Sequence, residues 1–137
     1  MKQFILFGFA LFMLLGNQLT YAQADKSDAS KTAKVEVYYF HLTRRCQTCQ
    51  AVESGAKQAM ESLYANQIKK GDYTFKAFNL DDKNSEQLAK RLNIGGQALV
   101  VVSGTKKIDI TNEGFLNARK PEKLKEEIRK AVNTVLK

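Results

Sequence analysis

The sequence predicts an α/β domain in which a central mixed sheet of about four strands carries helices on both faces. Two short runs, Val35 to Phe40 and Ala98 to Val102, are apolar at nearly every position, which is typical of strands covered on both sides. Longer segments between and after them repeat apolar residues at helical spacing. The resulting order, β-α-β-α-β-β-α, suits helices packed on both faces of one sheet.

The chain begins with a segment typical of secretory signal peptides. Lys2 supplies a positive start, Phe4 to Leu15 is apolar, and Ala22-Gln23-Ala24 has the small-x-small pattern of a cleavage site. We expect cleavage after Ala24, a flexible leader over 25–33 and the folded domain over 34–137. An uncleaved anchor is the alternative, although the apolar run is shorter than the roughly 20 residues of a membrane span. The prediction is a periplasmic or secreted protein whose mature chain has no membrane span.

The first half of the domain is predicted as strand, helix and strand. The strand Val35 to Phe40 is followed by a loop over Leu42 to Arg45, and a helix is expected from about Gln47 to Gln67. Its apolar stripe consists of Val52, Ala56, Ala59, Met60, Leu63 and Tyr64. Gly71-Asp72 then forms a turn, and Tyr73 to Leu80 is the second strand, joined to the first by a right-handed crossover.

The second half is predicted as helix, hairpin and helix. Asn84 resembles a helix N-cap, and Gly95-Gly96 is expected to end that helix. A tight connection after Ala98 to Val102 leads to Lys106 to Thr111, whose alternation predicts an antiparallel edge strand. Pro121 suits the first position of the last helix. The buried face of that helix is expected to contain Leu124, Ile128, Ala131, Val132 and Val135.

The two cysteines of the chain form one motif, Cys46-Gln47-Thr48-Cys49, between the first strand and the first helix. A helix start has partial positive charge and unpaired N–H groups, which stabilise a thiolate. The motif therefore predicts reversible thiol–disulfide exchange, in an exported compartment where a disulfide persists. A permanent structural disulfide is a second interpretation, although so short a loop gives only about 2 kcal/mol of stabilisation.

A third interpretation is a binding module, in which the two thiolates carry Cu(I) or trivalent arsenic. Zinc usually requires four ligands, and the only histidine is His41. We expect no resident metal and no organic cofactor, because the chain has neither a dinucleotide fingerprint nor a phosphate loop. The formal charge is +8, but the lysines are scattered and no nucleic-acid motif is present, so nucleic acid is not an expected partner. A redox-inert interaction domain is the remaining hypothesis.

Several neighbours of the cysteines are candidate site residues. Arg45 is either a positive charge beside Cys46 that favours the thiolate or a solvated loop residue, whereas Arg44 is more typical of a solvated loop. His41 ends the first strand and is either bonded to backbone or a proton carrier for the cysteines. Gly96, Gln97 and Ala98 are expected to form a ledge beside the cysteines, where the backbone of a partner can approach closely.

A strand followed by Cys-x-x-Cys and a long helix, in this order of elements, resembles the thioredoxin-like superfamily over about Lys34 to Leu136. More narrowly, Tyr38-Tyr39-Phe40-His41 and Thr43-Arg44-Arg45-Cys46-Gln47-Thr48-Cys49 resemble small exported bacterial proteins described as an ArsF-type subunit of a nitrophenyl-compound nitroreductase. The resemblance implies that Cys46 attacks a partner disulfide, that Cys49 resolves the mixed disulfide, and that Gln47-Thr48 tunes the redox potential. It also implies a protein disulfide or dithiol as partner, with a reductase subunit as one possibility.

The chain departs from the thioredoxin pattern at three positions. Arg45 stands where thioredoxins usually have tryptophan, and Phe40 is near the position of their buried acidic residue. Ala98 aligns with their cis-proline, and the only proline of this chain is Pro121. Because a cis bond before a residue other than proline costs about 3–4 kcal/mol, we expect a trans bond before Ala98.

Overall fold

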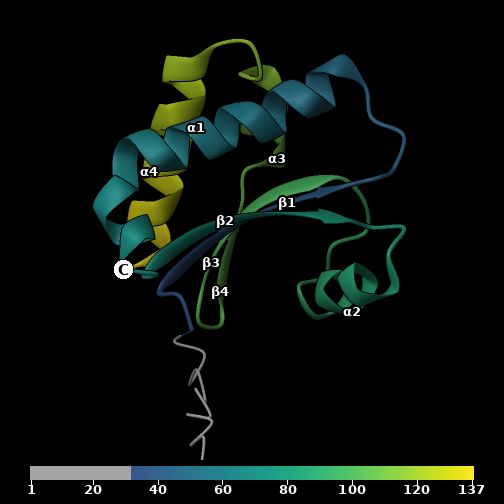
Figure 1. Ribbon diagram of the computed structural model, residues 1–137, viewed down its shortest axis with the longest axis horizontal. Coiled ribbons are helices and arrows are strands. Elements are labelled where there is room, and N and C mark those ends of the chain that lie inside the picture. The colour runs from purple at the N-terminus through teal and green to yellow at the C-terminus, as the bar shows by residue number, and fades with distance from the viewer. Residues whose placement is uncertain (1–31) are drawn as a thin grey trace, which may run out of the picture.

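The computed structural model describes residues 32–137, and the expected signal peptide and most of the expected leader lie outside the described residues. The described part has the predicted α/β architecture, with strands and helices that alternate along the first two thirds of the domain (Figure 1). The elements in chain order are β1 (Val35–His41), α1 (Gln47–Lys69), β2 (Tyr73–Asn79), α2 (Lys83–Arg91), β3 (Ala98–Ser103), β4 (Lys106–Asp109), α3 (Thr111–Leu116) and α4 (Pro121–Val135).

The four strands form one mixed sheet in the order β2-β1-β3-β4. β1 pairs with β2 in parallel and with β3 antiparallel, and β4 completes the sheet as an antiparallel edge. The central place of β1 explains its composition, because both of its faces are covered and Val37, Tyr39 and Phe40 are fully buried. The predictions of a buried first strand and an antiparallel edge strand are confirmed.

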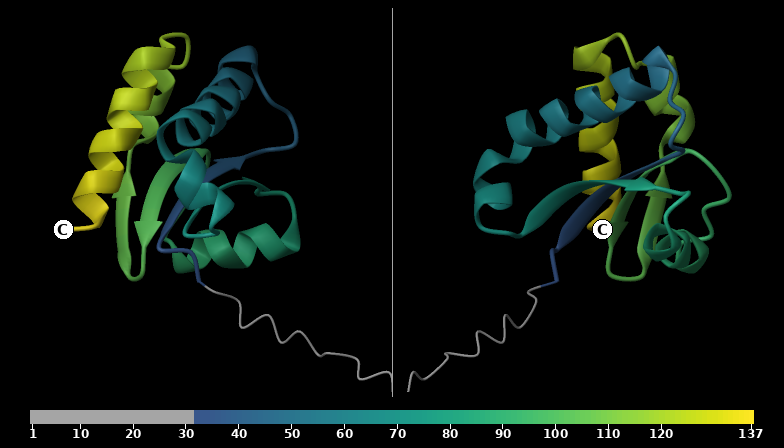
Figure 2. Two further views of the ribbon diagram at one scale, coloured as in Figure 1. Left: turned by 60° about the vertical axis from the view of Figure 1, so that its left-hand side comes forward. Right: turned by 45° about the vertical axis from the view of Figure 1, so that its right-hand side comes forward.

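Helices cover both faces of the sheet, and each face has its own hydrophobic cluster. α1, α3 and α4 lie on one face, and α2 lies alone on the other (Figures 1 and 2). On the first face, the larger cluster contains the whole predicted stripe of α4 and four residues of the predicted stripe of α1, Val52, Ala56, Ala59 and Met60. Tyr64 packs against the cluster, whereas Leu63 is half-buried and lies outside it. On the second face, Ala89 of α2 packs with Tyr38, Phe40 and Val100. The alternation of β1 therefore divides its side chains between two cores.

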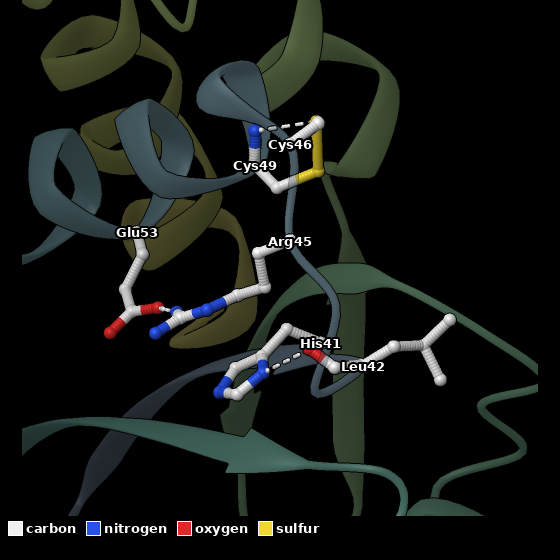
Figure 3. The surroundings of a disulfide bond; sticks show 6 residues. All are labelled: His41, Leu42, Arg45, Cys46, Cys49 and Glu53. Atoms are coloured by element: carbon white, nitrogen blue, oxygen red, sulfur yellow. Dashed lines mark hydrogen bonds and ion pairs between the residues drawn. A yellow bond between two sulfur atoms is a disulfide. The ribbon is translucent and has the colours of Figure 1, made fainter.

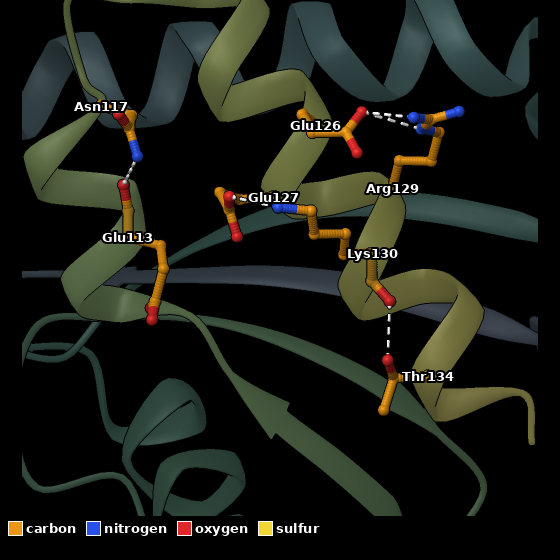
Figure 4. A network of polar contacts seen from close by, with 7 residues as sticks. All are labelled: Glu113, Asn117, Glu126, Glu127, Arg129, Lys130 and Thr134. Atoms are coloured by element: carbon orange, nitrogen blue, oxygen red, sulfur yellow. Dashed lines mark hydrogen bonds and ion pairs between the residues drawn. The ribbon is translucent and has the colours of Figure 1, made fainter.

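The surface of α4 shows the ion pairs expected of an amphipathic helix. Glu126 pairs with Arg129 and Glu127 pairs with Lys130, each three residues apart (Figure 4). Pro121 begins the helix, as predicted. Within the described residues, no helix is long and apolar enough to cross a membrane.

The structure corrects the predicted boundaries of α2. Asn84 is not the N-cap, because the helix begins at Lys83 after Asp82, and no side chain caps it. The helix also ends before the two glycines. Its last residue is Arg91, and Asn93 reverses the chain with a positive φ of 53°. Asparagine tolerates this left-handed conformation better than most residues, so it ends the helix in place of Gly95-Gly96.

The region after β4 contains a helix that the sequence did not predict. The edge strand ends at Asp109, and residues up to Thr111, expected to continue it, turn into α3. The turn is stabilised by the Asp109 carboxylate, which accepts hydrogen bonds from the amide and the hydroxyl of Thr111. Gly114 lets α3 pack closely, because a Cβ there would lie 3.0 Å from the Leu99 side chain.

Candidate functional site

The two cysteines form a disulfide at the start of α1, where Cys46 is the N-cap residue. Its backbone is extended, and its Sγ accepts a hydrogen bond from the Cys49 amide at 3.1 Å. The first N–H groups of a helix have no partner within the helix, and here the sulfur satisfies one of them. After reduction, a thiolate at this position would lie at the positive end of a 23-residue helix.

The two sulfur-bearing residues differ sharply in exposure. Cys46 is exposed, whereas Cys49 is buried with 4% of its surface accessible. Their Cα atoms are 5.1 Å apart, within the usual range for a disulfide. An attacking molecule therefore has access to Cys46, while the protein covers Cys49. This is the asymmetry that stepwise disulfide exchange requires.

Hydrogen bonds join the loop before Cys46 to the last residue of β2 and to the segment that follows it. The Thr43 amide donates to a carboxylate oxygen of Asp81 at 2.8 Å, and the Asn79 side-chain amide donates to the Thr43 hydroxyl at 2.8 Å. Hydrogen bonds from Thr43, first from its side chain and then from its backbone, hold the pKa of Asp81 below its ordinary value. Because β1 and β2 are parallel, their carboxyl ends meet at one edge and bring these residues together.

Arg45 forms an ion pair with Glu53 of α1. Figure 3 shows the Arg45 side chain extending away from the disulfide, toward the underside of the helix. Both side chains are partly buried, with 30% of Arg45 and 27% of Glu53 exposed. Arg45 is thus next to Cys46 in sequence, but its guanidinium is bound to a carboxylate.

Tyr39 and His41 lie on the same face of β1. Tyr39 is fully buried, and this burial raises the pKa of its hydroxyl, while the charge of Arg45 acts in the opposite direction. The His41 ring is 6.0 Å from the Tyr39 ring, and its Nδ1 lies 3.0 Å from the Leu42 carbonyl oxygen. A carbonyl only accepts, so Nδ1 carries the proton in this contact. His41 is therefore bonded to backbone and, in Figure 3, lies apart from the disulfide.

The expected ledge lies at the start of β3. Gly96 is exposed, Gln97 is half-buried and Ala98 is buried. Ala98 pairs with Phe40, so the ledge and the loop that leads to Cys46 leave the sheet at the same end. The segment lines a hollow of about 180 Å³, whose lining does not include either cysteine. No peptide bond among the described residues is cis, so the bond before Ala98 is trans, as predicted.

The dipeptide between the cysteines forms the first turn of α1, with Gln47 exposed and Thr48 half-buried.

A second hollow, of about 270 Å³, lies beside the first turns of α1. Its lining residues are Arg45, Gln50, Glu53, Ser54 and Lys57. The tuning roles of Arg45, Gln47, Thr48 and His41, and the partner role of the ledge, stay predictions.

Sequence reasoning missed three residues that position the site. Glu53 was not among the predicted site residues, although it follows Cys49 by one helical turn and has the opposite charge to Arg45. Asn79 and Asp81 carried a usable signal as well, because polar residues at the end of a strand and just after it meet those of a neighbouring parallel strand at one sheet edge. Within residues 32–137, no three side chains among histidine, cysteine, aspartate and glutamate gather as a metal site.

Comparisons of this chain with protein-family models, with curated proteins and with solved structures found no match. The function of the chain is therefore inferred from the geometry of the disulfide and its surroundings.

Proposed function

We propose that this chain is an exported thiol–disulfide oxidoreductase of thioredoxin-like fold that uses Cys46 and Cys49. The observation that carries the proposal is the position of the disulfide: an exposed Cys46 that caps a long helix is joined to a buried Cys49. Helix starts lower thiol pKa values, and the thiolate is the attacking form. The strand order β2-β1-β3-β4, with one parallel and two antiparallel pairings, supports the thioredoxin-like assignment.

The proposed reaction transfers two electrons from the dithiol to a partner disulfide. The Cys46 thiolate attacks one partner sulfur, which forms a mixed disulfide and releases the other partner sulfur as a thiolate. Cys49, after losing its proton to solvent, then attacks the Cys46 sulfur and releases the second partner thiolate. The products are the Cys46–Cys49 disulfide and a reduced partner dithiol. A dithiol from another protein resets the disulfide by the same steps in reverse.

Two serine variants test this assignment of roles. The reduced protein is mixed with glutathione disulfide, and the products are identified by intact mass. We expect wild type to form its internal disulfide, Cys49→Ser to accumulate one glutathione on Cys46, and Cys46→Ser to react at least tenfold more slowly, because Cys49 is buried. Equal adduct rates for the two variants would contradict the proposal.

The reduction potential gives an independent measurement. Equilibration with glutathione buffers is expected to place the Cys46–Cys49 couple above about −300 mV, the value below which structural disulfides lie. A lower potential would identify a permanent bridge. Stoichiometric binding of arsenite by the reduced protein, with no disulfide exchange, would instead favour the dithiol carrier.

A further inference from the structure

We infer that Glu53 is a positioning residue that holds the Arg45 guanidinium away from the Cys46 sulfur and balances the positive charge of Arg45. The Arg45–Glu53 ion pair thereby sets the reduction potential of the disulfide. The inference deepens the proposed function and rests on it. It changes the role of Arg45 expected from the sequence, in which a free positive charge acts directly on Cys46.

The Arg45–Glu53 pair differs from the other ion pairs of residues 32–137. Three of those pairs link residues three or four apart within one helix, and each has at least one side chain more than half exposed. The pair between Lys76 and Glu36 has an exposed lysine and a separation of 3.9 Å. In the Arg45–Glu53 pair both side chains are less than one third exposed, and the pair joins the active-site loop to α1. A partly buried pair is screened less by salt than an exposed one.

The direction of the Arg45 side chain agrees with this role. Its charge acts against the burial that raises the pKa of the hydroxyl of Tyr39, a fully buried residue of β1. In Figure 3, the Arg45 side chain lies between the disulfide above and His41 below, and it points along the underside of α1 toward Glu53. Arg45 is thus directed into the layer between β1 and α1, while the exposed Cys46 is directed to solvent.

The pair contributes no net charge near the disulfide, and each single neutralisation would leave one charge there. Other charged or titratable residues nearby are Arg44 and His41, which precede the motif in the sequence, and Lys57, which lies one turn beyond Glu53 and lines the same hollow as Arg45 and Glu53. An uncompensated guanidinium favours the thiolate and stabilises the reduced dithiol, whereas an uncompensated carboxylate does the reverse. The two single variants should therefore move the site in opposite directions.

The test measures the Cys46 pKa, by the ultraviolet absorbance of the thiolate, together with the glutathione equilibrium constant. For Glu53→Gln we expect a lower Cys46 pKa and a roughly threefold shift of the equilibrium toward the dithiol, which is about 14 mV at 29.6 mV per tenfold change. For Arg45→Met we expect a comparable shift toward the disulfide. The double variant should return close to wild type. Glu61→Gln is the matched control, since Glu61 is an exposed carboxylate two turns further along α1.

A pair that served only to hold the loop would give a different pattern. Both single variants would then change the two readouts in the same direction, or would change only the free energy of unfolding, and either result would overturn the inference. Arg45→Lys keeps the charge and provides a folded comparison if Arg45→Met unfolds. The Cys46 pKa is measurable even if wild type exchanges no disulfide. Failure of the proposed function thus shows in wild type, and failure of this inference shows only in the variants.

Discussion

Cys46 and Cys49 have the same side chain, and their different surroundings give them different chemistry. The N-cap position gives the Cys46 sulfur a backbone N–H donor and the positive end of a helix dipole. Cys49 lies three residues later, where the helix turns its side chain into the protein. The motif and its place before a helix were visible in the sequence, and the resemblance to thioredoxins implied different roles for the two cysteines. The ion pair between Arg45 and Glu53 could not be predicted from the sequence, because it depends on where the loop passes α1.

The contact between Thr43 and Asp81 predicts a pH dependence of the loop that precedes Cys46. The folded pKa of Asp81 is depressed, so the anchor is complete above the ordinary aspartate value of about 3.9 and is lost as the pH falls through the lower folded value. An NMR titration should therefore move the Thr43 amide signal with a midpoint below 3.9. Asp81→Asn should abolish that titration.

Asp82 provides the control for this experiment. Asp82 is an exposed carboxylate next to Asp81, and its side chain makes no capping hydrogen bond to α2. Asp82→Asn should leave the Thr43 titration unchanged. An ordinary midpoint in wild type, or an equal effect of the two substitutions, would show that Asp81 does not anchor the loop.

At the scale of secondary structure, α1 carries the site at its first turn and packs against α4 along its length. Gly55 lies where the two helices touch, and a Cβ at this position would be 2.8 Å from the Cδ2 atom of the fully buried Leu124. Gly55→Ala gains about 1 kcal/mol of helix propensity, but overpacking costs about 1–3 kcal/mol. We expect a net loss of about 1 kcal/mol in the free energy of unfolding, measured by urea denaturation.

Gly95→Ala is the matched substitution outside a packed contact. Gly95 is exposed, and a Cβ built there meets no atom within 4 Å. Its effect should stay within about 0.5 kcal/mol. A stabilised Gly55→Ala variant would mean that Leu124 moves aside and that helix propensity dominates at this contact.

The elements that the sequence predicted well are those with a clear period. β1 and β3 were predictable because both faces are apolar, and α4 because its stripe repeats over fifteen residues. α3 could not be predicted in this way, because its six residues are too few to show a helical period and one of them is glycine. Its start depends on hydrogen bonds from Thr111 to Asp109, and its packing on the close approach of Gly114 to Leu99. These interactions come from tertiary structure, which single-sequence patterns do not contain.

At the scale of the whole molecule, the disulfide lies outside the two hydrophobic clusters. The larger cluster lies between the sheet and α1 with α4, the smaller one lies between the sheet and α2, and neither includes Cys46 or Cys49. The disulfide lies at the end of α1, and its cysteines are only three residues apart. It therefore joins parts of the chain that are already neighbours in the sequence, and it closes no long loop.

This arrangement predicts that the reduced protein stays folded. Closing so short a loop restricts the unfolded chain little, so reduction should lower the free energy of unfolding by about 2 kcal/mol or less. A well-stabilised Cys46 thiolate would reduce the difference further, because the stability difference and the reduction potential are linked. Urea denaturation followed by circular dichroism, with and without a phosphine reductant, measures this difference. The Cys46→Ser/Cys49→Ser double variant, which carries no thiolate, should lose no more than the same 2 kcal/mol. Unfolding upon reduction would instead show that the disulfide is a structural element, and exchange with a partner could then not be its role.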